Sequence, residues 1–509
     1  MKAAYLVGVD IGTQGTKAVL VDARGRTRAT ALVKSRLRRP SPGAVEEDPE
    51  FQFRSVCRCI RQCMERSRIA AGQVAGIAID GQMAGIIGIG QDGLHVTPYD
   101  SWLDTRCVPD IARMKSEAGA EIIRRTGGPP SFNHGPKILW WQREHADVYR
   151  RIAAFVQPGG YAAMRLCALP ASGAFIDATY LHFSGFADNV RGAWDSGLCR
   201  TFGVAAAKLP RIVRPQAVVG GVAARCAARC GLVPGTPVVA GCGDTAASFL
   251  ACGATREGVC VDVAGTASVF AATTRRFCAD TRRGVLGWGR SVTPGLWHPY
   301  AYINGGGMNV EWFSRQIAGA GKRKDGVGAL DRLASRTPAA AADPLFLPHL
   351  GGRVAPSQPE LRGCWAGLTW SHSAAHLYRA VLEAVALEYC LYRDALLALN
   401  PELNIEEVRV TGGGQQSGLW NRIKADALQT RVVQVSRAEG APLGAALLAG
   451  WGVGLFDNLD AAARAWIKTG QAVCPDPALA AHYRGRLAGY ERLLDQMDGW
   501  SGTCTGATP

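Results

Sequence analysis

The sequence predicts an α/β protein of two domains, each with a mixed sheet flanked by helices, facing each other across a cleft. Two observations favour this class. A strand–turn–strand with Gly and Thr at its tip occurs near residues 5–21 and returns near 259–273, and apolar strands alternate with helical segments after each copy. At 509 residues the chain also exceeds the size of one growing core. We place the domains at residues 1–246 and 247–509.

The first hairpin carries the clearest sign of function. Predicted strands at residues 5–9 and 18–21 flank the turn GTQGT, residues 12–16, and the first strand ends on Asp10. Exposed N–H groups of such a turn bind anions, and a carboxylate beside them can hold a divalent metal. The alternative is an ordinary hairpin whose glycines only make the turn.

The remaining elements of the first domain follow in order. We expect a third strand at residues 26–34, a helix at 49–69 with Asp48 as N-cap and Pro49 in its first turn, and a buried strand at 74–80. This order predicts the opening half of an actin-like (ribonuclease H-like) nucleotide-binding domain. The middle region, 100–230, is expected to hold helices near 137–155 and 158–167 with loops between them.

The second half repeats the theme. An apolar strand at residues 234–243 runs into Asp244, and strands at 259–263 and 269–273 enclose AGTAS. Three glycines at 305–307 start a helix at 309–317, and a long helix is expected at 374–399. A strand at 407–411, a helix at 419–428, a strand at 432–435 and a helix at 442–448 complete this half. A duplicated fold of this kind predicts a nucleotide between the two hairpins.

Asp244, in GCGDTAAS, is the candidate catalytic base. A carboxylate at the end of a strand can accept a proton from a substrate hydroxyl as that oxygen attacks phosphorus. Alternatively, Asp244 only caps the helix that starts at Thr245. The glycines at 412–414 similarly suit either a flat adenine ring against the backbone or an ordinary tight turn.

Several other classes are excluded or disfavoured. The net charge is +15, but no aromatic residues interleave with the arginines, so we expect no nucleic-acid partner. No apolar run is long enough to cross a bilayer and the chain starts without an apolar leader, so we expect a cytoplasmic protein without a membrane partner. The sixteen cysteines include no CxxC, which argues against zinc. GIGQDG at 88–93 lacks a following helix and is interpreted as a hairpin turn, not a dinucleotide fingerprint.

With these residues placed, the sequence resembles the FGGY family of carbohydrate kinases, and within it the xylulokinases. The resemblance runs along essentially the whole chain. It rests on GVDIGTQGTK, GCGDTAAS, AGTAS, FLPHLGG, RGCWAGLTW, TGGGQQSGLWNRIKADAL and APLGAALLAG, in that order.

The resemblance implies transfer of the γ-phosphoryl group of ATP, with Mg²⁺, to a hydroxyl of a small sugar. D-Xylulose or a related pentulose is the first candidate for this sugar. It implies that Asp244 is the base and that Asp10 and Asp244 associate with the metal. The implied sugar contacts are Gln82, Met83, Ala84, Trp102, Asp104, His134, Asp244 and Thr245. The implied ATP contacts are Gly12, Thr13, Gln14, Lys17, Gly265, Thr266, Gly307, Glu311, Gly413, Gly414 and Ser417. Whether the protein forms a homodimer is not decided by the resemblance.

The departures from the family pattern concern the sugar pocket. Xylulokinases usually have His after the Met, where this chain has Ala84, and Asn after the catalytic Asp, where it has Thr245. His134 is the candidate to replace the absent imidazole. The alternatives are a kinase of another polyol, such as ribulose, glycerol, erythritol or a signalling diol, and a non-catalytic actin-like ATP-binding protein.

Overall fold

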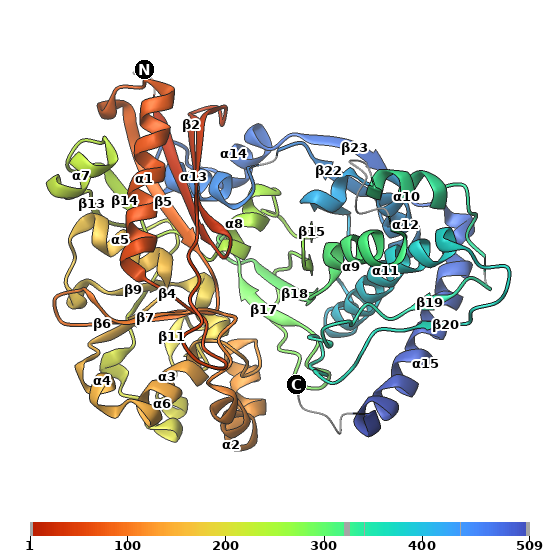
Figure 1. The fold of residues 1–509 in the computed structure, drawn as a ribbon. Coiled ribbons are helices and arrows are strands. Elements are labelled where there is room, and N and C mark those ends of the chain that lie inside the picture. The colour runs from red at the N-terminus through yellow and green to blue at the C-terminus, as the bar shows by residue number, and fades with distance from the viewer. Residues whose placement is uncertain (1–3, 320–325, 341, 438, 505–509) are drawn as a thin grey trace.

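A computed structural model describes residues 4–319, 326–340, 342–437 and 439–504. It shows two lobes, each built on one large mixed sheet (Figure 1). The first sheet has the order β13-β14-β5-β1-β2-β3, formed by Val218–Gly221, Pro237–Val239, Val74–Gly81, Tyr5–Gly12, Gly15–Asp22 and Thr27–Lys34. The second has the order β17-β18-β16-β15-β21-β22-β23, formed by Gly287–Arg290, Trp297–Ile303, Ser268–Ala271, Val259–Ala264, Glu407–Thr411, Val432–Val435 and Thr469–Val473.

The two sheets share the same central arrangement. β1 pairs antiparallel with β2 and parallel with β5, and β15 pairs antiparallel with β16 and parallel with β21. The duplication expected from the two hairpins is therefore confirmed, and the fold is the two-domain actin-like one.

Alternation along β1 explains how the lobes are joined. Val7 and Val9 face a core shared with α1 (Pro49–Ser67). Leu6, on the opposite face, packs in a core with α8 (Asp244–Ala251), α13 (Ala441–Gly452) and Val261 of β15. A Cβ on Gly8 would lie 1.9 Å from the carbonyl oxygen of Pro442, so α13 of the second half rests directly on β1. One core thus spans both lobes.

Further helices cover the outer faces of the two sheets. In the first lobe these are α1, α5 (Pro158–Cys167) and α7 (Ala224–Cys230), and in the second they include α9 (Gly306–Trp312), α11 (Ala374–Leu399), α12 (Gly418–Leu428) and α15 (Ala480–Cys504). The expected N-cap of α1 is confirmed, because the Asp48 side chain accepts from the backbone N–H of Glu50 at 2.8 Å.

The middle region is more ordered than the sequence predicted. The expected helix at 137–155 is wrong: His145, with φ −135° and ψ 57°, separates α3 (His134–Glu144) from α4 (Ala146–Arg151), and β8 (Ala154–Val156) follows. β8 joins β4 (Glu46–Glu47), β7 (His95–Asp100) and β6 (Ile86–Ile89) in a small sheet. The antiparallel pairing of β6 with β7 confirms the hairpin expected at 88–93. The long α2 (Val108–Thr126) occupies a stretch in which the sequence predicted no helix.

Two element boundaries also differ from expectation. The predicted strand at 234–243 ends as β14 at Val239, because Gly241 has φ +83° and lies against the carbonyl of Ile79. The helix expected at 309–317 begins earlier, at Gly306, and ends in a π-helical turn over Phe313–Ile317. In the described part of the chain, none of the helices has the length and apolarity needed to span a membrane.

Candidate active site

Three carboxylates gather where neighbouring strands end. The parallel register of β1 and β5 puts Asp10 beside Asp80, and a bridge between Gly81 and Gly243 brings Asp244 alongside. Burial raises the pKa of Asp10, and burial together with Asp10 and Asp244 raises the pKa of Asp80 well above its usual range. The protein therefore stabilises the charged forms of these carboxylates poorly, which suits a site that receives cations or protons.

Asp244 is placed as the first residue of α8, after Gly243 at the N-cap position. Its carboxylate accepts a hydrogen bond from the Thr245 hydroxyl at 3.1 Å, while the N-cap position of α8 belongs to Gly243 and has no side-chain cap bond. The capping interpretation is therefore not supported. Burial, with a smaller contribution from the negative charge of Asp10, raises the pKa of Asp244 to about 7. A carboxylate with this pKa is suited to accept a proton near neutral pH.

The first hairpin brings its turn up to Asp10. Gly12 pairs with Gly15 at the end of β1 and β2. A Cβ on Gly12 would lie 3.3 Å from a carboxylate oxygen of Asp10, so glycine allows the close approach of turn and carboxylate. Gln14 and Lys17 are exposed, and the positive charge of Lys17 lowers the pKa of Asp10.

A chain of hydrogen bonds connects this hairpin to two predicted sugar contacts. The indole N–H of Trp102 donates to the Thr13 hydroxyl at 2.9 Å, and this hydroxyl donates to the side-chain oxygen of Gln82 at 3.3 Å. The Gln82 amide donates to Glu47 at 3.4 Å, and burial raises the pKa of Glu47 to about 7. Trp102 and Gln82 are thus in contact with the predicted phosphate turn. Glu47 was not assigned a role from the sequence.

The predicted sugar contacts Met83 and Thr245 both lie close to Gly243, Met83 by packing and Thr245 two residues along the chain. A Cβ on Gly243 would lie 1.8 Å from the Met83 sulfur, so Met83 packs directly against the backbone that carries Asp244. Ala84 follows as a half-exposed residue.

His134 and Asp104 are placed differently from the other predicted contacts. His134 Nε2 bonds the Met83 carbonyl at 2.7 Å, and burial lowers the pKa of His134 to about 4. Its imidazole therefore positions Met83. Asp104 accepts from Arg106 Nε at 2.9 Å and from the Val45 backbone N–H at 2.9 Å, in a buried loop. Both of these bonds end on Oδ2, and Oδ1 accepts from the Arg106 backbone N–H at 3.1 Å, so each oxygen already has a partner within the protein.

The second hairpin assembles the predicted adenosine contacts. The backbone N–H of Gly307, at the start of α9, donates to the carbonyl of Gly265 at 3.0 Å in the turn that contains Thr266. A Cβ on Gly414 would lie 2.7 Å from the Ala264 side chain, which places the GGGQQSG turn beside this hairpin. Ser417 caps α12 by accepting from the N–H of Trp420 at 3.0 Å.

Two remaining predicted ATP contacts face open space. Gly413 has no atom within 4 Å of its hypothetical Cβ. Glu311 is exposed on α9 and pairs with Arg315 at 2.5 Å.

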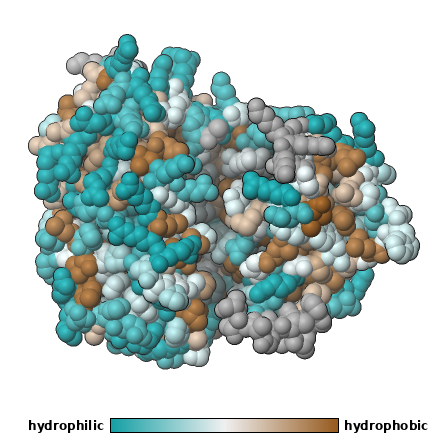
Figure 2. Space-filling view, viewed as in Figure 1, coloured by the Kyte–Doolittle hydropathy of each residue, from teal (hydrophilic) through white to brown (hydrophobic). Residues whose placement is uncertain are grey.

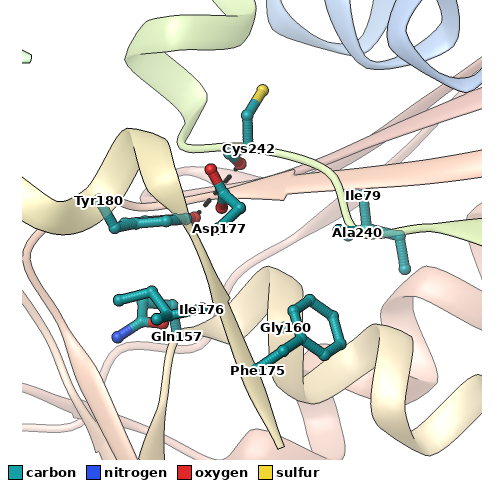
Figure 3. Close-up of a pocket in the computed structure, with 9 residues that line it drawn as sticks. All are labelled: Ile79, Gln157, Gly160, Phe175, Ile176, Asp177, Tyr180, Ala240 and Cys242. Atoms are coloured by element: carbon teal, nitrogen blue, oxygen red, sulfur yellow. Dashed lines mark hydrogen bonds between the residues drawn. The ribbon is translucent and has the colours of Figure 1, made fainter. Parts of the chain in front are cut away.

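Two residues that the sequence did not point to form hydrogen bonds with the backbone around Asp244. The 3₁₀ segment η3 (Ala178–Phe183) supplies Thr179, whose hydroxyl accepts from the N–H of Gly243 at 2.9 Å. Tyr180 donates from its hydroxyl to the carbonyls of Gly81 at 2.9 Å and Cys242 at 3.3 Å. Figure 3 shows Tyr180 reaching Cys242 across a small buried pocket. No sequence motif signalled these contacts, because they join segments more than sixty residues apart.

The fold and the site define a two-lobed actin-like protein with paired Gly–Thr hairpins and a carboxylate between strand ends. The model of the FGGY family of carbohydrate kinases, N-terminal domain, matches residues 5–251, and the model of its C-terminal domain matches residues 260–453. The chain belongs to this family and is a carbohydrate kinase, a phosphotransferase.

Individual relatives agree with this assignment. The chain is 25% identical to xylulose kinase of Bacillus subtilis (strain 168) over 493 residues, 96% of each chain, and 27% identical to gluconokinase of the same strain over 475 residues, 90% of this chain and 89% of that one. The crystal structure of xylulose kinase from Rhodospirillum rubrum matches with a TM-score of 0.90 and 27% identity, covering 98% of this chain and 100% of that one. The resemblance to xylulokinases is confirmed, and the chain is similar to a gluconokinase at a comparable identity.

Proposed function

We propose that this protein transfers the γ-phosphoryl group of ATP to a hydroxyl of a small sugar, with D-xylulose or a related pentulose as the first candidate. The observation that carries the proposal is Asp244, a half-buried carboxylate that forms a side-chain hydrogen bond with Thr245 and has a pKa raised to about 7. Asp244 accepts the hydroxyl proton while the sugar oxygen bonds to the γ-phosphorus and the bond to the ADP oxygen breaks. The proton then passes to solvent.

The two hairpins bind the phosphates of ATP from opposite lobes. The turn of Gly12 and Thr13 binds phosphate oxygens from the first lobe, and that of Gly265 and Thr266 binds them from the second. Gly307, Gly413, Gly414 and Ser417 hold the adenosine. On this assignment residues 1–246 bind the sugar and residues 247–509 bind the nucleotide, in a cytoplasmic enzyme supplied with ATP.

The acidic cluster fits a magnesium ion that arrives with the nucleotide. One oxygen of Asp10 and both oxygens of Asp80 are buried without a hydrogen-bond partner among the described residues. Within the same residues, no three His, Cys, Asp or Glu side chains form a group that could hold a metal on its own. We propose that Asp10, through its unpartnered oxygen, and Asp244, which lies beside it in the cluster, would hold the Mg²⁺ that accompanies the nucleotide. The ion neutralises negative charge on the phosphates.

The test is ADP release, measured with a coupled assay, on addition of D-xylulose, D-ribulose, erythritol, glycerol or D-gluconate. The proposal expects release that depends on one sugar and stops when EDTA removes the metal. ATP binding without stimulation by any sugar would contradict it and would favour a non-catalytic ATP-binding protein.

A further inference from the structure

A small hollow lined by Thr245, the residue that follows Asp244, lies between the two lobes. Met83 and Thr245, two predicted sugar contacts, form part of its wall together with His182 of η3. Gly289 and Arg290 at the end of β17, with Tyr300 on β18, form the opposite wall. The hydrophilic outer face in Figure 2 is indented between the lobes. The second lobe therefore contributes side chains to the predicted sugar pocket as well as to the nucleotide site.

Arg290 lines this hollow and has one donor without an acceptor among the described residues. Its Nη2 donates to the carbonyl of Val190 at 2.9 Å and to that of Asn189, and its guanidinium carbon lies 4.7 Å from the ring centre of Trp297. Its Nε is buried without a hydrogen-bond partner in the described part of the chain. Across those residues, no carboxylate lies within ion-pair distance of Arg290. The carboxylate of Asp188, which acts on Arg290 from further away, pairs with Arg125 instead.

His182 fixes the geometry of the same wall. It is 4% exposed, and its Nε2 lies 3.0 Å from the hydroxyl of Tyr300, a contact that crosses from one lobe to the other. Burial, followed by the neighbouring His134, lowers the pKa of His182 to about 3, so the ring is neutral. A Cβ on Gly289 would lie 3.1 Å from His182 Cε1, so the strand that carries Arg290 packs directly on the imidazole.

A purely structural role accounts for only part of these contacts. The two carbonyl bonds of Nη2 dock β17 on the first lobe, as does the bond from the N–H of Trp288 to the carbonyl of Gly127 at 2.7 Å. These docking contacts do not involve the Nε of Arg290, which has no acceptor among the described residues. A buried donor without an acceptor is costly, and guanidinium donors are geometrically suited to substrate oxygens.

We propose that Arg290, held in place by the His182–Tyr300 contact, is a specificity-determining residue whose Nε–H donates to an oxygen of the sugar substrate. This inference rests on the proposed sugar kinase activity and refines it. Because Arg290 belongs to the second lobe and Met83 to the first, a bound sugar contacts both lobes. Sugar binding then favours the arrangement in which the lobes close.

The test compares Arg290→Lys and Gly289→Ala with wild type. Lysine retains the positive charge but has no Nε–H in the guanidinium position. Gly289→Ala removes no polar group and displaces the imidazole of His182. Arg276→Lys is the matched control, because Arg276 lies outside the hollow and 3.7 Å from Glu402 at the surface. The measurements are kcat and KM for ATP and for each of D-xylulose, D-ribulose, glycerol and D-gluconate.

For the sugar that wild type prefers, Arg290→Lys is expected to raise the sugar KM about ten-fold or more, as loss of one charged hydrogen bond implies. Gly289→Ala should raise the same KM, and the KM for ATP should stay near the wild-type value in both variants. An unchanged sugar KM in both variants, or equal changes in the two KM values, would overturn the inference and leave the kinase assignment standing. Absence of sugar-dependent ADP release in wild type would instead overturn the proposed function, and the inference with it.

Discussion

The hydrogen bond from Thr245 to Asp244 gives a quantitative prediction for the pH dependence of the reaction. The Thr245 hydroxyl donates at 3.1 Å to the carboxylate and lowers its pKa, opposing the burial that raises the pKa to about 7. Since the base must be deprotonated, kcat/KM for the sugar should fall as the pH drops through about 7.

Thr245→Val removes this donor while keeping the shape of the side chain. A hydrogen bond to a charged group contributes about 1.5 kcal/mol, and one pKa unit corresponds to about 1.4 kcal/mol. The carboxylate loses stabilisation relative to the carboxylic acid, so its pKa rises. The acid limb of the profile should move upward by about one pH unit, and activity at pH 7 should fall.

The assay is kcat/KM for the sugar from pH 5.5 to 9 in buffers of constant ionic strength. Thr245→Ser is the control, because it keeps the hydroxyl and should keep the wild-type limb. If Thr245→Val titrated at the same pH as wild type, or if wild type had no limb near neutrality, the assignment of this limb to Asp244 would be refuted.

Three further predictions concern residues away from the base. Lys424→Met leaves Asp262 buried without its cationic partner and should cost about 3–5 kcal/mol, measured as a lower Tm, whereas the exposed substitution Arg275→Met should have little effect. Gly307→Ala puts a Cβ 2.4 Å from the carbonyl of Gly265 and should raise the KM for ATP at least several-fold without changing that for the sugar; equal affinity for ATP would contradict the adenosine assignment. Tyr180→Phe removes a buried donor and should lower kcat about ten-fold, since such a bond is worth about 1–1.5 kcal/mol; an unchanged kcat would show that the brace does not position the base.

Local patterns were sufficient to predict most of the framework. The hairpins, the capped helix α1 and the strands β5, β15, β21 and β22 each follow from periodicity and turn residues that lie close together in sequence. The break at His145 was missed because the residues on both sides favour a helix and only the packing of β8 in the small sheet requires a bend. The strand before Asp244 was overextended because apolar residues continue past Val239 to Cys242.

The sequence predicted those site residues whose carboxylates follow a strand and adjoin a turn, namely Asp10 and Asp244. Asp80 gave the same signal, an Asp near the end of a buried strand, and was not recognised. Arg290 and His182 gave none, because their proximity depends on the contact of two lobes and not on spacing in the chain. This wall of the pocket is formed by long-range packing, so its residues could not be predicted from sequence patterns.

The most direct test of the central claim is sugar-dependent ADP release by wild type and by Asp244→Asn, with binding of ATP and sugar followed separately by thermal shift. The amide keeps the size of the side chain but cannot accept the substrate proton as a base. If Asp244 is the base, turnover falls by about 10²–10⁴-fold while both ligands still bind. Turnover of Asp244→Asn close to the wild-type rate would contradict it.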